Sequence, residues 1–323
     1  MELYRRRFLG VAAGAVALPA LLRSAVALEY PTRPVHIVVG FPAGLSPDIV
    51  ARIVGQPLSQ RLGQPVVIEN KPGAGGNTGT DFVARATPDG YTLLLVTATN
   101  TVNATLYQNL DFDFSRDIVP VAGLDRGASV MVVNPSVPAK TVLEFIAYAK
   151  ANPGTIAFAS AGIGTPPHVC GALLMMLSGI QMLHVPYRGS FLPDLIGGQV
   201  HVCFSPVATV IEYIRTGKLR ALGVTTATRV SELPDVPAIG EFVQGYEASA
   251  WLGIGAPKGT STDVIGKLNT EINAVLAVPD VKARLDGLGV EAMSMTAADF
   301  GKLIADETEK WGKVIRATNI KAE

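Results

Sequence analysis

Three glycine-rich segments have the composition of anion-binding loops: Phe41–Asp48, Gly73–Gly79 and Ser160–His168. Each is expected to join a strand to a helix. The unpaired N–H groups and the dipole at a helix N-terminus attract anions, and glycine allows the backbone to approach a ligand closely. A tight turn would explain any one of these loops alone. The three together predict a site for a small anion such as a carboxylate.

Side chains in and near these loops leave alternatives open. Arg188 could form a bidentate pair with a carboxylate, or it could lie solvated at the surface. Asp48 could accept a hydrogen bond from a ligand amine or hydroxyl, or it could only stabilise the start of a helix. His168 lies just inside an expected helix, where it would orient or cap a loop. Trp251 is expected to pack near a crossing between domains.

The sequence lacks the motifs typical of nucleotide binding, of serine hydrolases and of metal sites. The run from Gly73 to Gly75 continues to Thr78 rather than to a third glycine, and the Lys-Ser/Thr ending of a P-loop is absent, so no nucleotide cofactor is expected. No Gly-x-Ser-x-Gly elbow occurs, since Ser160 lacks the preceding glycine. His168 could in principle pair with a serine or a carboxylate, but we do not expect an enzyme. The four histidines are isolated in sequence, so no metal site is expected.

The elements that must position these loops alternate between strand and helix. A strand at 35–39 leads into a helix with Ser46 as N-cap and Pro47 at its first position, and Gly63 closes that helix. A strand at 66–68, a helix at 78–86 and a strand at 91–96 follow. This β-α-β-α-β order predicts a mostly parallel sheet with helices on both faces.

The same alternation resumes after residue 130. Strands are expected at 130–133, 156–159, 184–186, 200–204 and 221–224, and helices at 142–151, 168–178 and 192–197. The C-terminal part is largely helical, and Thr296 with Asp299 resembles a capping box. The chain is long enough for two domains, each with its own core.

The N-terminus predicts export. Arg5–Leu9 is a basic segment of twin-arginine form, Leu9–Leu22 is a mild apolar run, and Ala25–Ala27 fits a signal-peptidase site. A membrane anchor is the alternative, but the run is shorter than the ~20 residues that span a bilayer, and Pro19 interrupts it. We expect cleavage near Ala27 and a periplasmic location. Since Sec signals also carry clustered arginines, the twin-arginine route is only favoured.

Composition fits an exported globular protein. Residues 1–27 contain four arginines and one glutamate, so their removal leaves 23 basic and 26 acidic side chains, a net charge of −3. No basic patch of the kind that follows a phosphate backbone is visible, so no nucleic-acid partner is expected. Cys170 and Cys203 could pair in an oxidising compartment or remain two buried thiols.

Segments along the whole mature chain carry a family resemblance. They are Tyr30–Val35, Gly40–Gly44 with Asp48, Leu62–Asn70, Pro72–Asn77, Pro88–Leu93, His184–Gly189, Asp194–Val200, Gly217–Leu222 and Leu233–Pro237. In this order they resemble the Bug-type extracytoplasmic solute receptors, the binding proteins of tripartite tricarboxylate transporters.

The resemblance implies an α/β protein of the periplasmic binding protein type II, or Venus flytrap, fold. Two doubly wound domains would be joined by a two-strand hinge, with residues 28–128 plus 251–323 in the first domain and 129–250 in the second. A ligand carboxylate would be held between the first loop and the Ser/Thr-Gly loop, partly through ordered water. The implied site comprises Phe41, Pro42, Ala43, Gly44, Asp48, Thr97, Thr99, Ser160, Ala161, Gly164, Thr165, His168, Tyr187 and Ser205.

The chain departs from the family pattern near this site. Leu45 replaces a second glycine in the first loop, Asn100 stands where a histidine is usual, and Ser205 with Pro206 replaces an Asp or Asn. Between Gly189 and Asp194 the chain also looks about two residues shorter than is usual in the family. Leu45 and the apolar Ile163 favour an aromatic or otherwise apolar carboxylate over citrate.

The sequence therefore predicts a monomeric periplasmic receptor that captures a small organic carboxylate, closes about its hinge and delivers the ligand to the membrane subunits of a tripartite tricarboxylate transporter. The alternatives are a periplasmic sensor for a signalling partner and a twin-arginine-exported hydrolase. Sequence alone does not separate transport from sensing.

Overall fold

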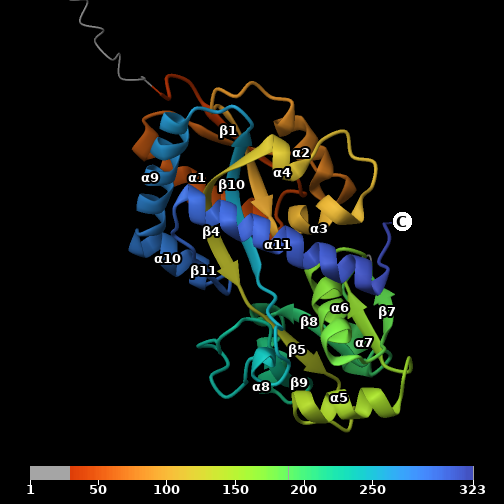
Figure 1. Cartoon of the computed structure of the whole chain (residues 1–323). Helices are drawn as coiled ribbons and strands as arrows, with labels where there is room; N and C mark the ends of the chain where they lie inside the picture. The colour runs from red at the N-terminus through yellow and green to blue at the C-terminus, as the bar shows by residue number, and fades with distance from the viewer. Residues whose placement is uncertain (1–29, 188, 323) are drawn as a thin grey trace, which may run out of the picture. The chain divides into compact units, whose positions relative to one another are not determined.

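The computed structural model describes residues 30–187 and 189–322 (Figure 1). The predicted export signal at 1–27 and the side chain of Arg188 lie outside these residues. Every helix and strand described below belongs to one compact unit, residues 31–323.

The first sheet has six strands in the order β11-β4-β10-β3-β1-β2. They are β1 (Val35–Val39), β2 (Val66–Asn70), β3 (Thr92–Thr97), β4 (Ile118–Gly127), β10 (Ala250–Pro257) and β11 (Val290–Ala292). Strand β1 pairs in parallel with β2 and β3, as the β-α-β-α-β order predicts. Strand β10 is antiparallel to both β3 and β4, so it joins the C-terminal part of the chain to this sheet.

Helices cover this sheet in two groups. They are α1 (Ser46–Leu62), α2 (Asn77–Ala84), α3 (Ala98–Leu106), α4 (Phe114–Asp117), α9 (Thr262–Leu276), α10 (Pro279–Asp286) and α11 (Ala297–Thr318), with the short η1 (Ala74–Gly76) before α2. Helix α1 contacts α9 and α10, whereas α11 contacts α3, and both α9 and α11 pack on β4. Trp251 of β10 is buried against Phe300 of α11, with ring centroids 5.6 Å apart.

The second sheet has five strands in the order β7-β6-β8-β5-β9. They are β5 (Ser129–Val133), β6 (Ala157–Ser160), β7 (Leu183–Pro186), β8 (Val202–Pro206) and β9 (Arg220–Val224). The accompanying helices are α5 (Val142–Ala151), α6 (Pro166–Ser178), α7 (Leu192–Gly197) and α8 (Val207–Arg215), with the short η2 (Ile239–Glu241). Strand β6 is parallel to β7 and β8, and β5 is antiparallel to β8 and β9.

The chain passes between the two sheets twice, which agrees with the two-strand hinge that the family resemblance implies. Strand β4 ends at Gly127 and β5 begins at Ser129, while the returning chain enters β10 at Ala250, which pairs with Gly127. Thr225 joins the two passes, since its hydroxyl accepts from the amide of Ser129 and its carbonyl accepts from the amide of Ala248. Trp251 lies one residue inside β10, so the expectation that it packs near a crossing is confirmed.

Helix α11 also contacts α6 as it runs past α3 (Figure 1). Its residues Trp311, Val314 and Ile315 belong to the hydrophobic core formed with β5, β6 and β8. Lys310 binds the carboxylates of Glu307 and Glu247, the latter at 2.9 Å. Because Glu247 lies just before β10, this ion-pair network attaches the C-terminal helix to the returning pass of the chain.

Most expected elements match, and the differences have local causes. The N-cap of α1 is Leu45 with extended dihedrals, so the expectation for Ser46 is wrong; the loop amide of Gly44 binds Asp48 instead. Gly63 ends α1 with a φ of +68°, as expected. Helix α3 was not expected, because its residues 98–106 are rich in threonine and asparagine, which have low helix propensity.

Two further expectations are settled by side-chain contacts. Thr296 caps α11, since its hydroxyl accepts from the amide of Asp299 at 3.1 Å. Cys170 and Cys203 are free, buried thiols rather than a disulfide.

The first two glycine-rich loops pack backbone to backbone. A Cβ atom on Gly40 would lie 2.8 Å from the carbonyl oxygen of Gly76, and one on Gly79 would lie 2.9 Å from the Cα of Gly40. The residues at these contacts must therefore be glycines for a steric reason.

Gly40→Ala is expected to destabilise the fold by about 1–3 kcal/mol, because the added methyl group meets backbone atoms that have no rotamer to change. Gly266→Ala in α9 is the matched control. No atom lies within 4 Å of its added Cβ, and the helix propensity of alanine should stabilise the protein by up to about 1 kcal/mol. Thermal melting of both variants tests this packing, and an unchanged or higher melting temperature for Gly40→Ala would contradict it.

Candidate functional site

A cavity of about 420 Å³ is lined by residues of both sheets and their helices. This volume lies within the range of small-molecule sites, about 300–1,000 Å³. The lining residues are Phe41, Ser46, Pro47, Ile49, Thr97, Ala98, Thr99, Asp125, Gly127, Ala128, Ser129, Pro166, Pro206, Ala208, Thr209, Ala250, Trp251, Leu252, Leu288, Gly289 and Val290.

The N-termini of four helices meet at this cavity. Ser46 and Ala98 begin α1 and α3, Pro166 begins α6, and Ala208 is the second residue of α8. Each helix follows the carboxyl end of a strand, namely β1, β3, β6 and β8. In open α/β sheets this edge is where ligands bind, and the unpaired amides and helix dipoles there favour an anion.

Charged side chains are scarce at the cavity. Among its lining residues none is Lys, Arg or His, and Asp125 is the one ionisable group. Asp125 is 2% exposed, and burial raises the pKa of its carboxyl group to about 7. Most other lining side chains are apolar. Attraction for an anion must therefore come from backbone amides and hydroxyl groups rather than from a salt bridge.

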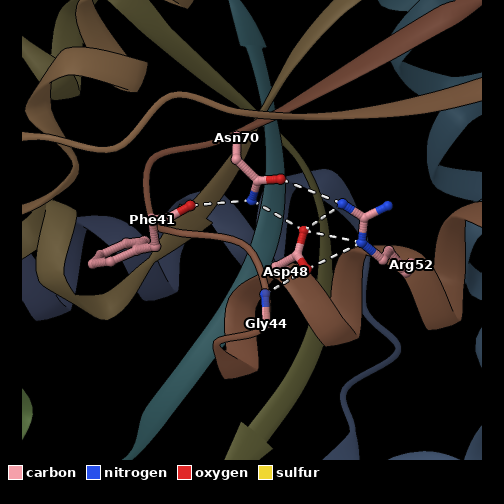
Figure 2. A network of polar contacts seen from close by, with 5 residues as sticks. All are labelled: Phe41, Gly44, Asp48, Arg52 and Asn70. Atoms are coloured by element: carbon pink, nitrogen blue, oxygen red, sulfur yellow. Dashed lines mark hydrogen bonds and ion pairs between the residues drawn. The ribbon is translucent and has the colours of Figure 1, made fainter.

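The first loop, Phe41–Leu45, is held by a network centred on Asp48 (Figure 2). The Asp48 carboxylate accepts from the amide of Gly44 at 2.9 Å and from the guanidinium of Arg52 at 2.8 Å. The Asn70 amide group donates to Asp48 at 3.0 Å and to the carbonyl of Phe41 at 3.1 Å. Both oxygens of Asp48 thus accept hydrogen bonds from Gly44, Arg52 or Asn70, which are contacts of the structural kind.

The hydrogen bonds from Arg52 are the main reason that the pKa of Asp48 falls from 3.8 to about 2, although burial opposes them. Arg52 itself is about half exposed. The carboxylate of Asp48 stays ionised over the physiological range, and the loop keeps its shape.

The second glycine-rich loop supports the first. None of the described residues 73–79 lines the cavity. Asn103 of α3 donates to the carbonyl of Gly75 and to the side chain of Asn77, both at 3.0 Å, and Gly76 lies beneath the ring of Phe41. Of the three glycine-rich loops, only the first and the third contribute residues to the lining of the cavity.

Asn100, which stands in the place of the family histidine, caps α3. Its side-chain oxygen accepts from the amide of Thr97 at 2.8 Å, and its amide group donates to Thr80 at 2.9 Å. Thr97 and Thr99 line the cavity at the start of this helix. The Asn100 cap thus fixes Thr97 and the start of the helix that carries Thr99.

Beneath the third loop, Ser160 lies beside two stacked histidines. The Ser160 hydroxyl lies 2.6 Å from Nε2 of His184, and the rings of His184 and His168 stack with centroids 3.7 Å apart. Nδ1 of His168 accepts from the amide of Gly164 at 3.1 Å. His168 thus orients the third loop, as expected from its place just inside a helix, and the serine contact is made by His184.

These groups form part of the scaffold of the third loop. Ser160 is fully buried, and none of the described acidic side chains hydrogen-bonds to either imidazole. Burial lowers the pKa of His168 to about 3 and that of His184 to about 4, so both rings are neutral at pH 7. The Thr165 hydroxyl donates to the carbonyl of Gly162 at 2.6 Å and closes the same loop.

The expected site residues fall into two groups. Phe41, Thr97 and Thr99 line the cavity, and Gly164 lines a small adjoining hollow with Thr99 and Pro166. The others lie outside the lining set: Pro42, Ala43, Gly44, Asp48, Ser160, Ala161, Thr165, His168, Tyr187 and Ser205.

Tyr187 and Ser205, which do not line the cavity, differ in their contacts. The Tyr187 hydroxyl donates to Asp194 at 2.7 Å, and burial together with this carboxylate raises its pKa to about 12. Ser205 lies within β8, and its buried Oγ has no hydrogen-bond partner among the described residues.

Several lining residues were missed by the sequence reasoning. They are the residues of the two crossing passes and of α8, such as Ser129, Ala208 and Thr209, together with Leu288–Val290. Their residue types carry no chemical signal. Asp125 was also missed, although an acidic residue within the apolar run 118–127 is a detectable anomaly.

Residues 30–187 and 189–322 contain neither a metal-binding cluster nor a membrane-spanning helix. No group of three or more His, Cys, Asp or Glu side chains there could hold a metal ion. No helix in the same residues combines the length and apolar character needed to cross a bilayer.

Residues 50–320 match the model of the tripartite tricarboxylate transporter family receptor. The chain belongs to this family. It is 35% identical over 322 residues to the protein BugT of Bordetella pertussis, with 98% of each chain covered. The family resemblance inferred from the motifs is therefore confirmed.

Solved structures agree with this assignment. An R. palustris protein solved with adipate is 32% identical, with a TM-score of 0.76 over 90% of this chain and 99% of that one. MatC from Rhodopseudomonas palustris with bound malate is 30% identical, with a TM-score of 0.73 over 88% of this chain and all of the other. The receptor chain thus has the type II periplasmic binding protein fold, and its family comprises periplasmic solute-binding proteins.

The Asp48 network predicts a pH-dependent stability. The folded-state pKa of about 2 lies below the ordinary value of 3.8, so the ionised carboxylate stabilises the fold above about pH 4. This contribution, about 2 kcal/mol, is lost as the pH falls through 2. Asp48→Asn should therefore lower stability at pH 7, and its difference from wild type should shrink between pH 4 and pH 2.

Urea denaturation at each pH measures this difference. Asp111→Asn is the control, because that carboxylate is 91% exposed and has one long ion pair, at 3.8 Å; its effect should stay within about 0.5 kcal/mol. An Asp48→Asn penalty that is equal at pH 7 and pH 2.5 would argue against the network as described.

Proposed function

We propose that this protein is a periplasmic receptor that captures a small organic carboxylate in the 420 Å³ cavity and delivers it to the membrane subunits of a tripartite tricarboxylate transporter. The convergence of four helix N-termini on one cavity carries this proposal. A site with this arrangement and with no basic side chain in its lining attracts a carboxylate through backbone amides.

The energy required is within reach of such a site. A dissociation constant of 1 μM corresponds to about −8 kcal/mol. Hydrogen bonds to a charged group contribute about 1.5–3 kcal/mol each, and apolar lining residues such as Ile49, Leu252 and Val290 add buried surface. A few amide contacts and an enclosed apolar body therefore account for tight binding of a monocarboxylate or dicarboxylate.

Relatives support this ligand class. The R. palustris protein was solved with adipate and MatC with malate, and both ligands are carboxylates. For this chain we propose a carboxylate with an apolar or aromatic body in preference to citrate, because a trianion would find no cationic side chain among the residues that line the cavity.

Capture would involve closure of two domains, residues 28–128 plus 251–323 and residues 129–250, about the two crossing passes. Phe41, Thr97 and Thr99 would touch the ligand from the first domain, and residues of the Ser160–Thr165 loop would approach it on closure. The other expected residues, including Asp48 and His168, would act by shaping the two loops. The protein would be monomeric and would reach the periplasm through the export signal that ends near Ala27, preferably by the twin-arginine route.

A charge placed at one helix N-terminus tests the proposal. Ala208, an exposed residue at the second position of α8, lines the cavity. Ala208→Asp should weaken carboxylate binding at least about tenfold, because two like charges within a few ångströms repel by more than about 1.4 kcal/mol at a protein surface. Ala208→Asn, which is similar in size and neutral, should retain much more affinity.

Ala298→Asp is the matched charge control, since Ala298 is the exposed second residue of α11 and does not line the cavity. The measurement is a thermal-shift screen of the mature protein against dicarboxylates, tricarboxylates, aromatic acids and amino acids, followed by calorimetry. A ligand at 100 times its dissociation constant stabilises the fold by about 2.7 kcal/mol. Absence of binding by every carboxylate, or equal losses in Ala208→Asp and Ala298→Asp, would refute the proposal.

A further inference from the structure

Asp125 occupies an unusual position for an acidic residue. It lies in β4, between β10 and β11, and pairs in register with Leu252 and Ala292. It is 2% exposed and lines the cavity. The helix N-termini described above meet at the same cavity, so this carboxyl group shares one ligand space with an anion site.

The Asp125 carboxyl group has no partner among the described residues. Its Oδ2 is buried without a hydrogen bond, and none of the described cations forms an ion pair with it. Arg126, the next residue, lines a separate cavity with Glu291 and Arg229, as expected because successive strand residues point to opposite sides.

An unpaired buried carboxyl group is costly. Leaving a buried polar group without a hydrogen bond costs about 1–3 kcal/mol, and more for a charged group. The raised pKa of Asp125, about 7, has burial as its cause and reflects the same missing partner. A ligand group that donates to Asp125 would remove this penalty on binding, so the residue favours ligands that carry such a donor.

The negative charge of Asp125 determines which kind of hydrogen-bond donor on the ligand it favours. With a pKa of about 7, most of Asp125 is ionised at pH 7.5, so a dicarboxylate that fills the cavity would bring its second carboxylate towards a like charge. A hydroxyl group can donate a hydrogen bond but brings no compensating charge. An ammonium group supplies both, since hydrogen bonds between ionised partners are about twice as strong as neutral ones.

Resting on the receptor function proposed above, we propose that the ligand is an amino-carboxylate whose carboxylate binds at the helix N-termini and whose ammonium group binds Asp125. The apolar lining then accommodates the body of the ligand. Asp125 acts as a specificity-determining residue that distinguishes amino acids and related zwitterions from simple carboxylic acids.

Matched ligand pairs test this inference on the wild-type protein. Each pair differs by one amino group: leucine and 4-methylpentanoate, phenylalanine and 3-phenylpropanoate, aspartate and succinate. Calorimetry at pH 7.5 should show that the amino member of at least one pair binds at least tenfold more tightly than its partner. Malate, with a hydroxyl group in place of the amine, should bind more weakly than aspartate.

The nearly isosteric variant Asp125→Asn should abolish the preference. Affinity for the amino member should fall at least tenfold, while affinity for the acid without the amine should stay equal or rise. Glu291→Gln is the charge-matched control, because Glu291 lies on the adjacent strand β11 and lines the other cavity; it should keep the preference.

The outcomes separate this inference from the receptor function. Binding of simple acids with no gain from the amine, unchanged in Asp125→Asn, would overturn the amino-carboxylate assignment and leave the receptor intact. Equal binding of malate and aspartate would overturn the ammonium assignment in favour of a hydroxyl donor. Absence of binding by both members of every pair, and by the wider carboxylate panel, would overturn the receptor function itself.

Discussion

The direction of the parallel strands is the constraint on which the site depends. Because β1, β3, β6 and β8 deliver the chain to one cavity, the helices that follow them all present their N-termini there. Unpaired amides and aligned dipoles then create a positive potential without any lysine or arginine in the lining. An anion site made from backbone tolerates wide variation in side chains, so members of one receptor family can bind adipate or malate on the same scaffold.

Such a site works only if its loops are rigid, and most of the polar residues near it serve that purpose. Asp48 and Asn70 fix the first loop, Asn103 fixes the second loop beneath it, and the stacked pair His168 and His184 lies under the third. These contacts are buried or half-buried. The polar groups that make them are hydrogen-bonded to the protein and are therefore not free to bind the ligand. Asp125 and Trp251 are exceptions, because both line the cavity and their buried Oδ2 and Nε1 atoms have no partner among the described residues.

Sequence patterns predicted the elements where a single physical signal dominated. Strand 35–39 and helices 142–151 and 192–197 match the structure at both ends, because apolar periodicity and turn residues agree there. Helix α3 was not predicted, because its threonine and asparagine residues are poor helix formers. The helix depends instead on the Asn100 cap and on packing against α11. The glycine-rich loops located the cavity, but sequence could not show that the second loop is only a support, or that Asp125 would meet residues about 125 positions away in β10. Both facts follow from tertiary pairing.

A crystal structure of the mature protein with its ligand would test the central claim most directly. The account predicts that a carboxylate group lies within hydrogen-bond distance of backbone amides at the N-termini of at least two of α1, α3, α6 and α8, in the cavity lined by Phe41 and Thr99. A ligand carboxylate bound instead by basic side chains elsewhere, for example at the surface hollow beside Arg316 and Lys321, would contradict it.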